Sequence, residues 1–320
     1  MKFVDIKNDV AFRKIFGNEN RKEVLISFLN AVLLLENDQK IISVDILTPY
    51  QLPALKGGKV TIVDVKAKDQ SNKSYVVEMQ VAEVDGFDKR VLYYASKSYS
   101  SQIDRGDLYK KLNPTFFIGI LDFEVTQNKE YISRHKIMDI ETGENYITDI
   151  EFNFIELPKF NKKETELTSV IDQWVYFIKN AENLEVIPKS VKDKGLKKAY
   201  EDAAKHNWTK TELDAYDYVL MREEDDRGRI SFATRKALEK AMAKASKQFE
   251  EVLKQKTNEL EQKDNELEQK DNELEQLGNA LEQKDINFAL KLILRGETNQ
   301  EISEITGLTE NQIENIRAKK

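Results

Sequence analysis

The sequence predicts an α/β fold, a mixed sheet with helices on its faces, and three features indicate it. Two segments, 61–69 and 75–81, alternate apolar and polar residues in the manner of half-buried strands. A continuous apolar run at 115–123 has the length of a buried strand. Helical segments before and after these strands give the order helix, strand, strand, strand, helix, strand, which suits a sheet covered by helices.

The N-terminal elements are delimited by capping and turn residues. Asn8 can cap a short helix that runs through Phe16 and stops at Gly17. The elements expected next are an amphipathic helix over 18–35, a strand over 41–52 that ends near Pro53, a turn at Gly57-Gly58, the strand 61–69, a polar turn at 69–74, the strand 75–81, a helix over 87–104 and the buried strand 115–123.

The chain after residue 123 is expected to extend the sheet and then to become helical. Gly143 and Pro158 bracket further strands near 130–156. Helices are expected over 164–182 and 192–246, with Trp174 and Trp208 in packing roles.

The two alternating strands bring two acidic residues together. Paired as a hairpin, they place Val63, Val65 and Ala67 on one face of the sheet. Asp64 and Glu78 then lie side by side on the other. Neighbouring carboxylates in a partly apolar setting repel each other, and a cation between them relieves the repulsion. Oxygen ligands of this kind suit Mg²⁺ or Mn²⁺. The alternative is an ordinary solvent-facing pair of strand residues.

The sequence from Asp64 through the hairpin to Glu78-x-Gln80 resembles the active-site pattern of the PD-(D/E)XK nucleases, in the version that ends in glutamine instead of lysine. The segments 3–17, 90–102, 106–109 and 117–123 follow in an order that resembles the Rpn family, recombination-promoting nucleases also described as PD-(D/E)XK transposases. The resemblance covers roughly residues 1–220.

This resemblance implies a restriction-endonuclease-like mixed sheet flanked by helices. It also implies a metal-dependent DNA endonuclease, a hydrolase of phosphodiester bonds that is linked to recombination, mobile elements and phage defence. The second hypothesis is a catalytically silent DNA-binding or assembly protein that retains the fold. The intact set of Asp64, Glu78 and Gln80 favours the enzyme.

The resemblance gives the site residues their roles: Asp64, Glu78 and Gln80 form the catalytic set, and Asp64 and Glu78 bind Mg²⁺ or Mn²⁺. The neutral amide of Gln80 can orient water but cannot act as a base or supply positive charge. Lys66 could supply the missing cation, or it is a solvated strand lysine. Asp9 could add a third acidic ligand, or it stabilises the start of its helix.

Four more residues are candidates with open alternatives. Arg90, Tyr94 and Gln102 could lie near one face of the helix that follows Glu78, where they would support the site or contact DNA phosphates. Buried packing is the alternative for Tyr94. Asp122 ends an apolar strand, where a cap or turn role is expected.

The composition excludes several other kinds of site. Cysteine is absent, so disulfides and zinc–thiolate sites are excluded. Two histidines, His135 and His206, argue against a histidine-rich metal site or a Ser-His-Asp triad. No apolar run approaches the roughly 20 residues that span a bilayer. The start of the chain lacks a signal-peptide pattern. We therefore expect a cytoplasmic protein with no membrane partner.

The net charge of −7 is unevenly distributed. Residues 1–110 hold 17 lysines and arginines against 15 aspartates and glutamates, a net of +2, so the remainder carries −9. A near-neutral catalytic part with an acidic tail is compatible with DNA as a partner, and predicts modest affinity for DNA in bulk.

A seven-residue repeat distinguishes the C-terminal third. The sequence from Asn258 to Asp264 recurs at 265–271, and in altered form at 272–278 and 279–285. Leucines recur every seven residues, at Leu253, Leu260, Leu267, Leu274 and Leu281. This predicts a coiled coil through which the chain self-associates. The companion position holds lysine or aspartate except at Leu277, which favours a spacer or weak dimer over a strong oligomerisation module.

The last segment resembles a helix-turn-helix around the turn 307–309, with Thr309 and Gln312 forming a capping box. Its apolar positions at helical spacing are Ile302, Ile305, Leu308, Ile313 and Ile316. Glu310 and Glu314 face phosphates badly, which favours packing or self-association over DNA contact.

The expected domains are a nuclease core at 1–160, a helical extension at 161–245, a heptad-repeat coiled coil or spacer at 246–285 and a helical hairpin at 286–320. The family resemblance adds one partner, a short C-terminal product that restrains the nuclease. Met242 precedes the heptads and could start it.

Overall fold

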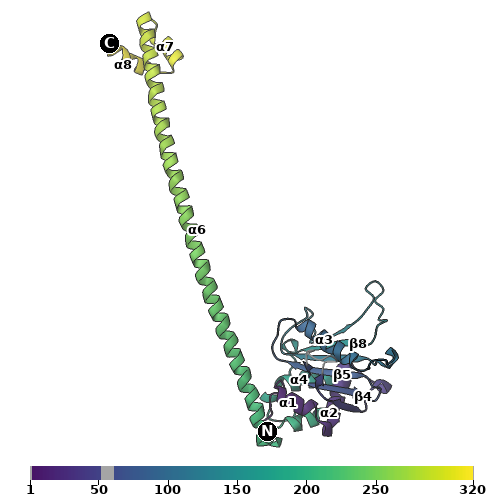
Figure 1. Cartoon of the computed structure of the whole chain (residues 1–320). Coiled ribbons are helices and arrows are strands. Elements are labelled where there is room, and N and C mark those ends of the chain that lie inside the picture. The colour runs from purple at the N-terminus through teal and green to yellow at the C-terminus, as the bar shows by residue number, and fades with distance from the viewer. Residues whose placement is uncertain (1, 52–60, 320) are drawn as a thin grey trace. The chain divides into compact units, whose positions relative to one another are not determined.

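The computed structural model describes residues 2–51 and 61–319. The chain divides into two compact units, Met1–Gly228 and Arg229–Lys320. Figure 1 shows the chain with its elements labelled. The helices of the first unit are α1 (Asp9–Phe16), α2 (Lys22–Leu33), α3 (Phe87–Ser100), α4 (Val170–Asn180), α5 (Lys194–Ala203) and the start of α6 (Lys210–Arg295). The strands are β1 (Val44–Leu47), β2 (Tyr50–Gln51), β3 (Thr61–Ile62), β4 (Val65–Asp69), β5 (Ser74–Gln80), β6 (Thr115–Leu121), β7 (Ile132–Lys136) and β8 (Ile150–Glu156).

Six of the strands form one mixed sheet, in the order β1-β4-β5-β6-β8-β7. The pairs β5–β6 and β6–β8 are parallel, and the pairs at both edges are antiparallel. The strands β2 and β3 pair with each other in a small second sheet. The predicted fold class, a mixed sheet with helices on its faces, is confirmed.

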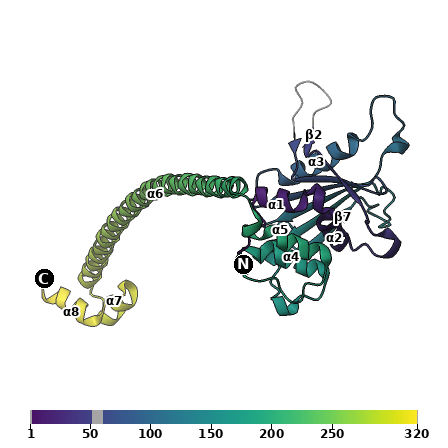
Figure 2. The ribbon, with the colours of Figure 1, turned by 90° about the horizontal axis from the view of Figure 1, so that it is seen from below.

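Helices α1, α2, α4 and α5 pack together on one face of the large sheet, and α3 covers the other (Figure 2). Aromatic side chains dominate the first layer: Phe16 lies against Phe12, Phe28 and Trp174 with ring centroids 4.5–5.6 Å apart. Such pairs add to the free energy already gained from burying their large apolar area. Trp174 is buried there and Trp208 is buried against Tyr216, so both tryptophans pack as predicted.

The opposite layer is smaller. Val91, Tyr94 and Ala95 of α3 are buried with Val76 of β5 and Phe117 of β6. Because side chains alternate along a strand, β5 supplies Tyr75, Val77 and Met79 to the first layer and Val76 to this one.

Helix α1 begins and ends where the sequence predicts. The Asn8 side chain accepts hydrogen bonds from the N–H groups of Val10 (3.0 Å) and Ala11 (3.4 Å), and so caps the helix. At the other end, a Cβ on Gly17 would lie only 2.7 Å from the carbonyl oxygen of Arg13. Glycine is therefore required there by close approach.

Several predicted elements are shorter or divided. The helix predicted over 18–35 is a 3₁₀ turn at Glu19–Arg21 followed by α2, and the one predicted over 87–104 ends at Ser100. The strand predicted over 41–52 is divided into β1 and β2. Pro53 and the Gly57-Gly58 turn lie outside the described residues.

The helix predicted from residue 192 to 246 is α5 and the beginning of α6. The chain leaves the helix at Ala204 because it pairs there with the N-terminal segment: Val4 N–H donates to the Ala203 carbonyl and Lys205 N–H to that of Lys2, both at 2.9 Å. This non-local pairing has no counterpart in the helical periodicity of the segment.

The predicted strand 61–69 is interrupted at Asp64, which lies in a bend between β3 and β4. The prediction that Val63 shares a face with Val65 and Ala67 is therefore wrong. Val63 is buried on the α3 side, whereas Val65 and Ala67 face the other helices. The alternation fails because Val63 N–H donates to the Pro49 carbonyl at 3.1 Å and the chain turns before it joins β5.

The second unit contains the rest of α6, α7 (Asn299–Thr306) and α8 (Glu310–Ala318). The heptad leucines lie within α6 and are between 54% and 65% exposed. The end of α6 packs against α7 and α8 through Ala289, Leu292, Ile293, Ile302, Leu308 and Ile313.

The predicted hairpin around the turn 307–309 is formed by α7 and α8, and the end of α6 adds a third helix to it. The predicted capping box of Thr309 and Gln312 is confirmed. Of the apolar positions at helical spacing, Ile302, Leu308 and Ile313 are buried, whereas Ile305 is 57% exposed. The guanidinium of Arg317 is bound within the unit, to Asn299 Oδ1 and the Glu297 carbonyl.

Within the described ranges, we find no helix with the length and apolarity that crossing a membrane requires.

Candidate active site

Asp64 and Glu78 meet where β4 and β5 pair. The register sets Val65 opposite Val77, so the next position along the ladder sets Asp64 opposite Glu78. Both residues are buried, with 8% and 6% of their surface exposed. The bend at Asp64 frees its backbone N–H from the ladder, and this N–H is used by the site itself.

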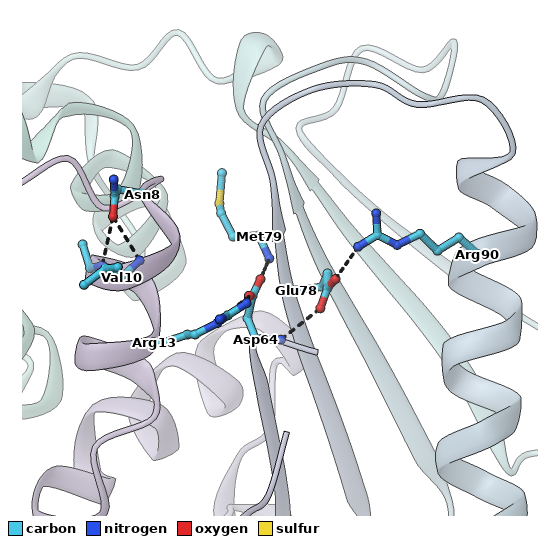
Figure 3. A network of polar contacts seen from close by, with 8 residues as sticks. Asn8, Val10, Arg13, Asp64, Glu78, Met79 and Arg90 are labelled. Atoms are coloured by element: carbon cyan, nitrogen blue, oxygen red, sulfur yellow. Dashed lines mark hydrogen bonds and ion pairs between the residues drawn. The ribbon is translucent and has the colours of Figure 1, made fainter. Parts of the chain in front are cut away.

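The two acids are hydrogen-bonded crosswise. The N–H of Asp64 donates to Glu78 Oε2 at 3.1 Å, and the N–H of Met79 donates to Asp64 Oδ2 at 2.9 Å (Figure 3). One oxygen of each carboxylate is thus fixed by the backbone of the opposite strand. The other oxygen of each carboxylate faces a cation.

Two arginines supply these cations from opposite layers of the domain. Arg13 of α1 donates from Nε and Nη2 to Asp64 Oδ1, at 3.0 and 2.8 Å. Arg90 of α3 donates from Nη2 to Glu78 Oε1 at 2.8 Å (Figure 3). The Arg90 guanidinium also lies over the buried Tyr94 ring, 5.1 Å from its centroid. Arg90 therefore contacts Glu78 directly, and the buried Tyr94 contacts Arg90 from within the core.

The charge of Asp64 affects the ionisation of its acidic neighbours. Burial, and next the charge of Asp64, raise the pKa of Glu78 to about 8, although Arg90 opposes the shift. Burial and the charge of Asp64 also raise the pKa of Asp9. Against the effect of burial, the hydrogen bond to Asp64 raises the pKa of Arg13. Three carboxylates therefore share one partly desolvated region.

The oxygen donors of Asp64 and Glu78 fit a hard divalent cation. Mg²⁺ keeps several of its waters and is commonly held by one or two carboxylates together with substrate phosphate oxygens. No cluster of three metal-ligating side chains occurs in the described part of the chain. Two carboxylates within a partly apolar surround remain sufficient for such an ion.

Gln80 makes a different contact. It lies two residues beyond Glu78 on β5, and its side-chain amide donates to the Ala82 carbonyl at 2.9 Å. Its N–H donor is thereby directed along its own strand. The structure brings Asp64 and Glu78 together, and it holds the Gln80 amide on the backbone that follows.

Lys66 pairs with Val76 and so faces α3. Burial, followed by the charges of Lys68 and Lys97, lowers its pKa. The charges that act most strongly on Lys66 are thus those of other lysines.

Gln102 makes its hydrogen bonds away from Asp64 and Glu78. It lies beyond the end of α3, and its amide donates to the Asn113 carbonyl (2.9 Å) and Thr115 Oγ1 (3.2 Å), at the start of β6. Asp122 lies in a bend directly after β6, as predicted for a turn residue.

Arg13 is the site residue that sequence reasoning did not identify. It lies in the segment 3–17, but it meets Asp64 across 51 positions of sequence. Its spacing from Asp9, four residues along α1, places both on one face of that helix. That spacing is the one local signal, and it does not indicate which strand the face meets.

Residues 6–233 match the family model of the PD-(D/E)XK nuclease family transposases. The matched span includes Asp9, Arg13, Asp64, Glu78 and Arg90. Searches of the curated proteins and of the solved structures give no significant match.

Proposed function

Because the chain belongs to the PD-(D/E)XK nuclease family of transposases, we propose that it is a Mg²⁺-dependent DNA endonuclease whose site is Asp64 and Glu78. Membership gives it a nuclease- and transposition-related function. The proposal of a metal-dependent endonuclease rests chiefly on the two buried carboxylates. They are hydrogen-bonded crosswise, and each also contacts an arginine.

Asp64 and Glu78 would hold Mg²⁺, and Mn²⁺ has the same preference for oxygen ligands. A bound divalent cation supplies an activated water and offsets charge on the phosphate. The chain's own groups position that chemistry, because backbone N–H groups fix one oxygen of each acid. Gln80, released from Ala82, can orient a water through its amide but cannot take its proton.

We further propose that the DNA cleavage serves recombination of mobile elements and defence against phage, as the Rpn resemblance implies. A second candidate, a silent DNA-binding or assembly protein, is favoured by one observation. Both carboxylates are already paired with arginines, and such an arrangement is stable without any metal.

Plasmid cleavage separates the two candidates. We expect the purified chain to nick or linearise supercoiled DNA in Mg²⁺ or Mn²⁺, and to lose this activity in EDTA and in Asp64→Asn. Asp45→Asn is the matched control, because Asp45 is an exposed acid of β1 paired with Lys22 at 3.3 Å. Equal activity in wild type and Asp64→Asn would reject the site. DNA binding without cleavage in either metal would favour the silent protein.

For the second unit, we propose that two copies of the chain pair in parallel through the heptad leucines. With these leucines at position d, Lys256, Lys263 and Lys270 occupy position g and Glu261, Glu268 and Glu275 occupy position e. In a parallel pair each g residue faces the e residue five positions later in the other copy, so lysine meets glutamate throughout. An antiparallel pair would set lysine against lysine.

The pair should be weak, because Asp264 and Asp271 fall at position a of the seam. Aligned copies stack five leucine layers, and a slip of one heptad loses one of them. The unpartnered leucines of α6, more than half exposed in the single chain, support this proposal.

Charge exchange and a single cysteine test this pairing. One variant replaces three glutamates by lysine, at Glu261, Glu268 and Glu275, and should sediment as a monomer. A second variant replaces three lysines by glutamate, at Lys256, Lys263 and Lys270. Mixing the two variants should restore the dimer. Lysine at Glu259, Glu266 and Glu273, on the outer face, is the control. Since the chain has no cysteine, Leu253→Cys should cross-link to itself only in a parallel pair. Cross-linking of Leu253→Cys to Leu281→Cys instead would reject it.

We also propose that a short product starting at Met242 restrains the nuclease, because it would contain every heptad leucine. An immunoblot against the C-terminus should detect it in expressing cells and lose it in Met242→Leu. Its absence in wild type would remove the idea.

A further inference from the structure

We propose that Arg13 and Arg90 are exchangeable counter-ions, which neutralise Asp64 and Glu78 in the metal-free protein and transfer to a DNA phosphate when a divalent cation binds the carboxylates. The inference rests on the proposed nuclease function and gives two of its residues a role in binding the substrate.

A source of positive charge is needed because the motif position that usually holds lysine is occupied by Gln80. The amide of Gln80 is neutral and is hydrogen-bonded to Ala82. Lys66 faces α3, and its pKa is lowered first by burial and then by the charges of Lys68 and Lys97. Arg13 and Arg90, in contrast, contact the two carboxylates directly, at 2.8 Å each.

The hydrogen bonds of the carboxylates favour an exchange of arginine for metal ion. Asp64 Oδ2 and Glu78 Oε2 are held by backbone N–H groups, whereas Asp64 Oδ1 and Glu78 Oε1 hold the arginines. A cation that approaches the latter oxygens must share them with the guanidinium groups or displace them. Metal and arginine therefore compete for the same two atoms.

The charge balance indicates what the displaced arginines bind. When both acids are ionised, as ligation of a metal ion requires, the two carboxylates and the two guanidinium groups sum to zero. A divalent cation adds two positive charges, and a phosphodiester carries one negative charge and gains another when the attacking water has released a proton to solvent. A single scissile phosphate thus restores neutrality to the four side chains and the metal.

The positions of the arginines suit this transfer. Their side chains are 46% and 36% exposed, so each can move without opening the core. They approach the acids from α1 and α3, on opposite sides of the pair (Figure 3). The planar guanidinium fork matches the oxygens of a phosphate as well as it matches a carboxylate.

A purely structural clamp is the competing explanation, and two binding measurements separate it from exchange. The first is Mg²⁺ affinity by calorimetry without DNA, and the second is affinity for a short fluorescent duplex in Ca²⁺ and in EDTA. The variants are Arg13→Gln and Arg90→Gln in the full chain. Arg21→Gln is the matched control, since Arg21 is 35% exposed and pairs with Glu201 and Asp202 away from the site.

Exchange predicts opposite changes in the two affinities. Each site variant should bind Mg²⁺ roughly tenfold more tightly, because a competitor is gone, and bind the duplex roughly tenfold more weakly in Ca²⁺. In EDTA, where the arginines stay on the carboxylates, duplex affinity should change little. Arg21→Gln should alter neither affinity. Arg13→Lys and Arg90→Lys should restore part of the duplex affinity, and they serve if a glutamine variant does not fold.

Unchanged or weaker Mg²⁺ binding, or equal loss of duplex affinity in Ca²⁺ and EDTA, would overturn the exchange. Failure of the proposed nuclease has a different signature, since wild type itself would then bind no Mg²⁺ and gain no duplex affinity in Ca²⁺.

Discussion

Four of the buried carboxylates of the first unit form two groups with opposite surroundings. Glu156 and Asp172 each lie beside a lysine, with Lys159 Nζ at 2.8 Å and Lys162 Nζ at 2.6 Å. Against the effect of burial, the hydrogen bond from Lys159 lowers the pKa of Glu156, and that from Lys162 lowers the pKa of Asp172 to about 2. Hydroxyl and backbone donors complete both sets of hydrogen bonds.

Asp64 and Glu78 are comparably buried, but each has the other acid as its neighbour, and the pKa of Glu78 rises to about 8. Burial alone therefore does not distinguish the acids of the proposed site from structural ones. The distinguishing feature is a second carboxylate in the same space, because burial and the charge of Asp64 together oppose ionisation of Glu78 even though Arg90 is present.

The largest expected difference between the two groups of carboxylates is in their effect on the rate of DNA cleavage. Glu78→Gln removes a proposed anionic metal ligand while keeping its shape, and should lower the rate of plasmid cleavage at least about a thousandfold, or about 4 kcal/mol. Asp172→Asn, assayed at a temperature where circular dichroism shows it folded, should keep its rate within about tenfold of wild type. Equal losses in the two variants would remove the distinction between the groups.

The next difference is in stability and runs the other way. Asp172→Asn should lower the free energy of unfolding by about 2 kcal/mol, because Lys162 and Tyr131 lose a charged acceptor. Glu78→Gln in EDTA should cost less, since it also removes repulsion from Asp64. Urea unfolding at neutral pH measures both changes in free energy. A larger loss of stability in Glu78→Gln than in Asp172→Asn would contradict the view that Asp172 is the more stabilising acid.

The two acids should also give opposite dependences on pH. The pKa of Glu78 is about 8 in the folded chain against an ordinary 4.5, so the folded state retains the proton and this group's contribution to stability falls as pH rises between those values. Asp172, with a pKa of about 2 against 3.8, contributes stability above 3.8 that is lost as pH falls toward 2.

Unfolding midpoints in EDTA across this range check both signs. Glu78→Gln should flatten the decline on the alkaline side, and Asp172→Asn should reduce the loss in acid. If the unfolding midpoint of Glu78→Gln falls with rising pH as steeply as that of wild type, another titrating group causes the fall.

The smallest effect is expected at Lys66. Because its strongest electrostatic neighbours are Lys68 and Lys97, Lys66→Gln should change cleavage by less than about twofold. A tenfold loss would instead give Lys66 the role of the missing motif lysine. Parallel assays of Arg13→Gln show whether the guanidinium groups act in its place.

The sequence predicts the acidic pair because a hairpin is local. The turn at 69–74 and two alternating strands suffice to set Asp64 opposite Glu78, whatever the rest of the fold does. The mixed sheet and the cap at Asn8 depend equally on local periodicity and on short-range hydrogen bonds, and they were predictable for the same reason.

What the sequence does not contain is how the layers dock. The contact of Arg13 with Asp64 depends on the seating of α1 against the sheet, and the end of α5 depends on pairing with residues near Val4. The bend that moves Val63 to the α3 side depends on the carbonyl of Pro49. Each is a choice between partners distant in sequence, and periodicity does not rank such partners.

The crosswise hydrogen bonds have a consequence for how this site can be lost. Since the Glu78 carboxylate holds the backbone of Asp64, and the Asp64 carboxylate holds the backbone after Glu78, neither acid keeps its position independently. We therefore expect a first substitution that removes either acceptor to weaken the position of the other acid, and a second substitution to add less than the first. Inactivation along a lineage would thus be abrupt, and reversion at one position would recover the whole arrangement, because the remaining acid still encodes half of its partner's support.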